Sequence, residues 1–348
     1  MMFWLFVYIC YLIFNQPVGI VVPHHNIVAE RRIQMLKIIK QKRIFTDKIV
    51  VISPDHFSSD QRSIYYSDAN WNFKNSNISY DSSFDKYLNS NIKLNNNLVK
   101  GDHGAFNILT DLSVIWPKSK VVPILIGQQI DLKDMDEFIQ NLNNYCGYNC
   151  LLVSSVDFSH YLPYKLADIH DQESISALIN MNLKDSKQIE VDSPQSIYSL
   201  INFSNNKHAN KFVLYDHTNS AELVGNKDSE STSHIFGWYE RNLFGKHYEY
   251  NVKTFTNANN LSKNDNLHSL GERFFYGIDE LNLFDSKISK NIIVAGYETE
   301  KEVKKEYLPL TCNEKRCFFA RGEEKKKLLQ NILGEVDNQD GEITITKD

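Results

Sequence analysis

The amino-acid sequence predicts an α/β protein, with a single three-layer α/β/α domain around a mostly parallel or mixed sheet and a small α+β extension at the C-terminus. From residue 19 onward, short continuous apolar runs alternate with amphipathic stretches, which is typical of strands that helices cover on both faces. Hydrophobic residues make up 42% of the 348 residues and charged residues 23%, as in globular proteins. Beyond residue 255 the chain turns polar and loses its periodicity, so we expect a linker there.

We divide the chain into a leader at residues 1–18, an α/β domain at 19–255, and a linker with a C-terminal extension at 256–348. The run Met1–Phe14 is almost wholly apolar but shorter than the roughly 20 residues that a membrane-spanning helix needs. It predicts a signal peptide or an anchor, and therefore an exported or membrane-anchored protein. The alternative is a buried first strand or a misplaced start codon in a cytoplasmic protein, because no Lys or Arg precedes the run and no small-residue cleavage motif follows it.

Each element follows from its local pattern. Continuous apolar runs predict strands at 19–23, 48–53, 121–126, 150–156, 221–224 and 234–239. Apolar residues at three- or four-residue spacing predict helices at 29–41, 106–116, 135–145, 166–179, 193–202 and 209–215. The Tyr-, Asn- and Ser-rich passage at 58–82 is expected to be a long surface loop. In the extension we expect short strands at 273–277 and 291–295 and a charged helix at 323–333.

Composition excludes two classes of protein. The formal net charge of −5 leaves no basic field for a polyanion, so no nucleic-acid partner is expected. A mean hydropathy of −0.39 excludes a membrane protein with many spans, and we expect membrane contact only through the leader.

The five cysteines form no recognised framework. Cys146 and Cys150 are separated by three residues, and Cys312 and Cys317 by four. Neither pair has zinc-ligand spacing, and Cys312–Cys317 is the favoured pair for a single disulfide in an oxidising compartment.

Polar residues follow several of the predicted strands. His24 comes after the first strand and His56 after the second, Asp157 and His160 follow the strand at 150–156, and Asp102 and His103 precede a helix. Because ligands of α/β sheets bind at the carboxyl ends of the strands, we expect these side chains to meet. Imidazoles with a carboxylate suit iron, copper or zinc.

Ordinary roles compete with this interpretation. Asp102 and Asp157 are each placed to cap the following helix, since Asp is a favoured N-cap residue. The remaining histidines outside the motifs are interpreted as surface or hydrogen-bonding residues: His25, His170, His217, His234, His247 and His268.

Five of these segments, in order, resemble the motifs of the Memo family, whose prokaryotic members are called AmmeMemoRadiSam system protein B. They are Val22-Pro23-His24-His25, Ile52-Ser53-Pro54-Asp55-His56, Asp102-His103-Gly104, Val121-Val122-Pro123-Ile124 and Val153-Ser154-Ser155-Val156-Asp157-Phe158-Ser159-His160. The resemblance covers residues 19–239, about two-thirds of the chain.

The resemblance implies the fold of the catalytic subunit of class III extradiol dioxygenases and an iron or copper ion held by two histidines and a cysteine. The two histidines correspond to His24 and His56. The family's Cys-Gly-x-His segment is aligned with Asn205-Asn206-Lys207-His208, so His208 is kept whereas Asn205, a weak ligand, replaces the cysteine. We therefore expect His24, His56 and His208 as metal ligands, and His103, His160 and Asp157 as catalytic residues that are also able to complete the metal shell.

Two functions follow, and the sequence leaves open whether the protein is an enzyme. The first is a metal-dependent oxidase or dioxygenase-like activity, with a non-haem iron or copper ion, or zinc, and an unknown small-molecule substrate. The second is a non-catalytic module that uses the same pocket to hold a small ligand or a partner, which the family resemblance connects with radical-SAM proteins. A zinc hydrolase is a weaker third interpretation, because no helical HExxH motif is present.

Overall fold

The structure, a computed structural model, describes residues 16–241 except 44, 148, 182, 184, 185, 187, 188 and 227–229, and in the C-terminal part residues 273–276, 292–298, 302–313, 316–319 and 342–346. The chain forms two compact units. The first contains residues 1–158, 181–218 and 234–247, and the second contains residues 159–180, 219–233 and 248–348. The predicted leader and the predicted helix at 323–333 lie outside the described residues, apart from residues 16–18.

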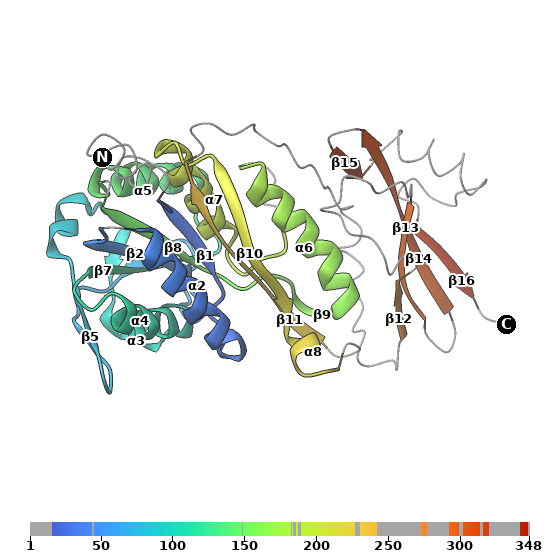
Figure 1. The fold of residues 1–348 in the computed structure, drawn as a ribbon, viewed down its shortest axis with the longest axis horizontal. Helices are drawn as coiled ribbons and strands as arrows, with labels where there is room; N and C mark the ends of the chain where they lie inside the picture. The colour runs from blue at the N-terminus through green and yellow to red at the C-terminus, as the bar shows by residue number, and fades with distance from the viewer. Residues whose placement is uncertain are drawn as a thin grey trace, which may run out of the picture. The chain divides into compact units, whose positions relative to one another are not determined.

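Four parallel strands form the centre of the sheet in the first unit (Figure 1). In spatial order they are β1 (Gly19–Val22), β8 (Cys150–Ser155), β2 (Lys48–Pro54) and β7 (Lys120–Ile126). Their residues are almost all buried, as expected for strands that are covered on both faces. In register, Val51 of β2 lies between Val153 of β8 and Pro123 of β7. The strands therefore end level with one another.

Antiparallel strands extend this sheet on both sides. On one side β11 (Glu230–Glu240) pairs with β1, and β10 (Lys211–Asn219) follows it. On the other side β3 (Ile64–Tyr66) pairs antiparallel with β7, and β6 (Ile92–Leu94) lies beyond it. The short strands β4 (Trp71–Asn72) and β5 (Asn77–Tyr80) form a hairpin, and β5 also pairs with β7. The predicted α/β class with a mixed sheet is confirmed.

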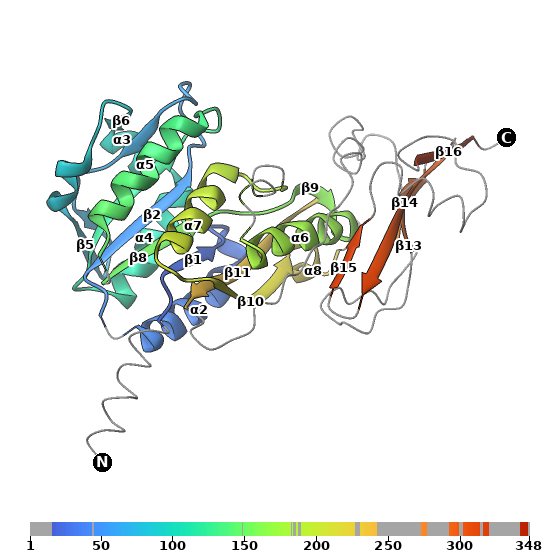
Figure 2. The same ribbon diagram turned by 90° about the horizontal axis from the view of Figure 1, so that it is seen from above.

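Helices cover both faces of the sheet (Figures 1 and 2). One face carries α2 (Ala29–Lys42), α3 (Asn96–Gly101) and α4 (His103–Ile115), and the other carries α5 (Leu132–Tyr145) and α7 (Pro194–Asn206). Two 3₁₀ turns complete the unit, η1 (Asn26–Val28) and η2 (Ser82–Tyr87). Side-chain caps begin the longer helices: Asp102 accepts from Gly104 N–H at α4, Asp131 from Asp134 N–H at α5, and Ser193 from Ser196 N–H at α7.

In the second unit, β9 (His160–Pro163) leads into α6 (Tyr164–Ile179) and pairs antiparallel with the first residues of β11. The one-turn helix α8 (Ser220–Leu223) precedes that strand. The C-terminal strands are β12 (Arg273–Tyr276), β13 (Ile292–Glu298), β14 (Glu302–Asn313), β15 (Arg316–Phe319) and β16 (Glu342–Thr346). They form an antiparallel sheet in the order β12-β13-β14-β15, with β16 beside β14.

Three predicted elements were wrong. The expected loop at 58–82 contains three short strands, because Ile64 and Tyr66 pair with β7 and Tyr80 pairs with Val121. The expected helix at 209–215 belongs to strand β10, where hydrogen bonding to β11 outweighs a helical spacing in a segment rich in β-forming residues. The expected strand at 221–224 is α8, since the Asn219 side chain accepts from Ala221 N–H at 2.8 Å and starts a helical turn.

A disulfide joins Cys146 at the end of α5 to Cys150 at the start of β8. The predicted Cys312–Cys317 bridge stays a prediction, although these two residues lie opposite each other in the β14–β15 pair. Among the described residues, we find no helix with the length and apolar character that crossing a bilayer requires.

Candidate metal centre

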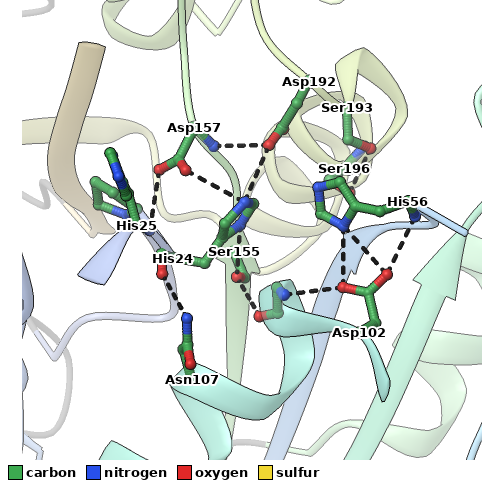
Figure 3. A network of polar contacts seen from close by, with 12 residues as sticks. His24, His25, His56, Asp102, Asn107, Ser155, Asp157, Asp192, Ser193 and Ser196 are labelled. Carbon is green, nitrogen blue, oxygen red and sulfur yellow. Dashed lines mark hydrogen bonds and ion pairs between the residues drawn. The ribbon is translucent and has the colours of Figure 1, made fainter. Parts of the chain in front are cut away.

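The carboxyl ends of three parallel strands and the start of one helix bring four predicted site residues together, three of which, His24, His56 and Asp157, are drawn in Figure 3. His24 follows β1, His56 follows β2, Asp157 follows β8, and His103 is the first residue of α4. Ring centroids of His103 and His56 lie 4.1 Å apart, and those of His24 and His103 lie 5.0 Å apart. His24 is buried, His56 is partly buried and His103 is exposed, so the cluster leads from the core to the surface.

His24 presents one ring nitrogen to two carboxylates. Its Nε2 atom lies 3.2 Å from Asp157 Oδ2 and 3.4 Å from Asp192 Oδ2. On the other side of the ring, Nδ1 lies 3.3 Å from Ser155 Oγ, and the Ser155 hydroxyl donates to Gly104 O at 2.6 Å. Because the serine proton is used there, a neutral ring that donates Nδ1–H to Ser155 is the tautomer that leaves Nε2 free for a metal ion. The Nε2 lone pair then faces the two carboxylates.

His56 is oriented in the same way. Its Nδ1 atom lies 3.0 Å from Asp102 Oδ1, and its backbone N–H donates to Asp102 Oδ2 at 3.1 Å. Asp102 also accepts from Gly104 N–H at 2.8 Å, so one carboxylate caps α4 and orients the imidazole. A histidine that donates one ring N–H to a carboxylate or another acceptor exposes the other nitrogen, which is the usual arrangement of a metal ligand.

Asp192 lies two residues before the start of α7 and belongs to the same cluster. Asp157 N–H donates to Asp192 Oδ2 at 3.0 Å, and Asp192 N–H donates to Asp157 O at 3.0 Å. The second carboxylate oxygen of Asp192, Oδ1, is buried and has no hydrogen-bond partner. A buried carboxylate oxygen without a partner is costly and points to a missing cation or proton.

Burial dominates the electrostatics. It lowers the pKa of His24 to about 4, although Asp157 acts in the opposite direction, so the ring is neutral at pH 7. Burial and the adjacent His56 lower the pKa of His103. Burial and the neighbouring Asp157 raise the pKa of Asp192 well above its usual range. For Asp102 burial opposes ionisation, but the hydrogen bonds from His56 and Gly104 outweigh it and lower the pKa.

Two groups of side chains have ligand atoms close enough to share a metal ion. They are His24, His56 and His103, and His24, Asp157 and Asp192, each group with its atoms within 4.8 Å of one another. The two groups share His24.

Comparisons with known proteins agree with the motifs. A family model described as Memo-like protein matches residues 13–234. The chain belongs to the Memo-like family. Among curated proteins it is 21% identical over 223 residues to MEMO1 family protein Ta0237 of Thermoplasma acidophilum, covering 60% of this chain and 80% of that protein. A crystal structure of the uncharacterized protein JW3007 from Escherichia coli K12 is similar at a TM-score of 0.44 and 12% identity, covering 63% of this chain and 98% of that one.

The structure places the predicted Memo-like site residues in three groups. His24, His56, His103 and Asp157 lie together, next to Asp102. His160 is the first residue of β9 in the second unit, and its catalytic role stays a prediction.

His208 is not brought to this cluster. It lies in the turn after α7, with a positive φ of 57°, and its N–H donates to Asn205 O. The 13 residues of α7 separate it from Asp192 by about 20 Å of helix. A Cβ atom on Gly19 would lie 2.9 Å from Ser204 Oγ, so this end of α7 packs over the start of β1, whereas His24 follows the end of β1. Asn205 and His208 therefore occupy the opposite edge of the sheet.

Asp192 was not predicted from the sequence. It follows no apolar run, and its only local signal is its position in Asp192-Ser193-Pro194, directly before a predicted helix. Such a pattern is typical of a helix start and by itself predicts a cap rather than a ligand.

Proposed function

We propose that this Memo-like protein holds a divalent transition metal at the cluster of His24, His56 and Asp192, with Asp157 beside them, and that it uses the metal in oxidase- or dioxygenase-like chemistry. The observation that carries the proposal is the arrangement around His24 Nε2, where a ring nitrogen and two carboxylates converge within 3.4 Å. Three acceptors that face one another repel unless a cation or a proton lies among them. The unpartnered Oδ1 atom of Asp192 supports the same conclusion.

The kind of ligand favours iron. Two imidazoles with a carboxylate and open positions are the ligand set of non-haem iron oxygenases, whereas copper(I) is selected by thiolates and thioethers. No cysteine belongs to the metal-capable groups found in the described part of the chain. Zinc accepts the same ligands and is the second choice. The predicted iron or copper therefore becomes iron in our proposal.

Each side chain has a distinct part in this function. His24 and His56 bind the metal through Nε2, and their Nδ1–H groups are held by Ser155 and Asp102. The metal supplies redox chemistry and open positions for a substrate. His103 is exposed, lies beside His56, and is placed to exchange a proton between substrate and solvent as a general acid or base.

Metal analysis of protein purified without a histidine tag tests this proposal. We expect near-stoichiometric iron in the wild type and strong losses in His24→Ala, His56→Ala and Asp192→Asn. His208→Ala is the matched control, because it removes a histidine at the opposite edge of the sheet and leaves the metal content unchanged. Metal-free wild-type protein that takes up no iron would contradict the proposal, and so would equal losses in His208→Ala and His56→Ala.

Oxygen consumption separates the enzyme from the non-catalytic module of the second hypothesis. An enzyme loses oxygen uptake in His103→Ala while it keeps its iron, whereas a binding module shows no uptake in any variant. A radical-SAM partner rests on the family resemblance, and co-purification of such a protein with the wild type is its test.

A further inference from the structure

The backbone that carries His24 leaves the sheet before His24 is reached, so its carbonyl groups find partners elsewhere. Strand β1 ends at Val22 and the turn η1 begins at Asn26. The three carbonyls between them belong to Pro23, His24 and His25. All three accept hydrogen bonds from side chains: Arg32 Nη1 donates to Pro23 O at 3.1 Å and His25 O at 3.3 Å, and Asn107 Nδ2 donates to His24 O at 3.0 Å.

Arg32 occupies an unusual position for an arginine. It is 1% exposed and lies on the apolar face of α2 together with Met35, Leu36 and Ile39. Its Nε atom donates to Asp111 Oδ2 at 2.5 Å, and Asp111 is itself buried on α4. A buried pair of this kind adds little stability compared with well-packed apolar residues, because removing two charges from water is costly. Stability therefore does not explain why Arg32 and Asp111 are buried as a pair.

Helix α4 contacts the segments that carry both histidine ligands. Asp102, at its start, holds the ring and backbone of His56. One and two turns further along the helix, Asn107 holds His24 O and Asp111 holds Arg32. The two loops that carry His24 and His56 come from different strands, yet both are tied to this one helix.

We propose that Arg32, fixed by Asp111, is a positioning residue that sets the imidazole of His24 against that of His56 for metal binding. The inference rests on the proposed metal site and identifies what holds it in shape. Arg32 does not touch the metal, and its planar guanidinium is needed because three donors must reach two carbonyls and one carboxylate at fixed angles. Lysine, with a single ammonium group, does not donate to these three acceptors at the same angles.

The test replaces the pair by apolar residues of similar volume, in Arg32→Met with Asp111→Leu, and measures Co²⁺ affinity by visible absorption. We expect a folded protein with affinity about 10- to 100-fold weaker than wild type, as is typical when a partner of a metal ligand is removed. Arg43→Met is the matched control. Arg43 is also buried and also donates to backbone carbonyls, those of Pro17, Phe45 and Cys150, but at the opposite edge of the sheet. It should lose stability and keep its Co²⁺ affinity.

Wild-type affinity in the folded double variant overturns the inference, and so does an equal loss in Arg43→Met. If the double variant does not fold, Arg32→Lys is measured instead, and we expect the same direction of change.

A second measurement separates this inference from the metal proposal. In metal-free protein, the imidazole ¹H–¹⁵N signals of His24 should shift in the double variant and stay in place in Arg43→Met. Wild-type protein that binds no Co²⁺ would contradict the metal site, and the imidazole signals would then decide on Arg32 alone, with unchanged signals counting against it.

Discussion

The buried His24 should make the stability of the metal-free protein depend on pH. Burial lowers its pKa from 6.5 to about 4 in the folded state, whereas the unfolded chain keeps the ordinary value. Between these two values the unfolded state binds more protons, so the free energy of unfolding decreases as the pH falls. The pKa difference, 6.5 − 4 = 2.5, corresponds to about 3 kcal/mol of the free energy of unfolding. This contribution is lost mainly between pH 6.5 and pH 4.

Urea unfolding of chelator-treated protein, followed by circular dichroism from pH 7 to pH 4, measures this loss. His24→Gln is the reference, because glutamine keeps a neutral polar side chain but does not titrate. The stability that the substitution loses through altered packing does not depend on pH. The other titrating groups, including Asp192, are present in both proteins. The wild type should therefore lose about 3 kcal/mol more than the variant over this range. Parallel pH dependences in the two proteins would refute the assignment of a neutral, desolvated His24.

Three further predictions concern the surroundings of the site. Gly104→Ala should cost about 1–3 kcal/mol in urea unfolding, because the new Cβ would lie 2.0 Å from Ser53 Oγ and 3.2 Å from His56 Cε1. Gly101→Ala, where a Cβ meets nothing within 4 Å, should cost nothing, and equal effects at both glycines would contradict the steric argument. Asp102→Asn should weaken Co²⁺ binding by about 10- to 100-fold, because an uncharged amide orients His56 less firmly, and an unchanged titration would exclude this role. Metal at about 100 times its dissociation constant should raise the free energy of unfolding by about 2.7 kcal/mol, an increase that EDTA must reverse if the ion binds the folded protein.

The parallel centre of the fold could be predicted because its strands are buried on both faces. The runs that became β1, β2, β7 and β8 are continuously apolar and differ from their surroundings in composition alone. The short strands between residues 64 and 80 could not be predicted, since each has only a few residues and depends on pairing with β7 or, for β4, with β5. The segment 209–215 was assigned a helix for the same reason, whereas the strand expected at 221–224 is a helical turn that the Asn219 side chain caps. Strand β10 depends on β11, which follows it in the chain.

The site residues also fall into those that the sequence could predict and those that it could not. His24, His56 and Asp157 follow predicted parallel strands, and the carboxyl ends of such strands meet at one edge of a sheet, so their proximity was predictable. Asp192 could not be found in this way, because it precedes a helix on the other face and reaches the cluster only through the direction in which α7 crosses the sheet. For His208 the motif alignment was misleading, since the length of α7 carries that residue to the opposite edge.

The sequence by itself determined the α/β class, the parallel strands and the histidines at their ends, because hydrophobic periodicity and strand direction are local properties of the chain. Only the tertiary structure decided which carboxylates face His24 and what holds the His24 loop in place. Asp192, Asn107, Arg32 and Asp111 are remote from His24 in the sequence or ordinary in their local pattern, and Arg32 is the plainest case. An arginine on an apolar helix face indicates no function until the fold places an aspartate and two backbone carbonyls around it.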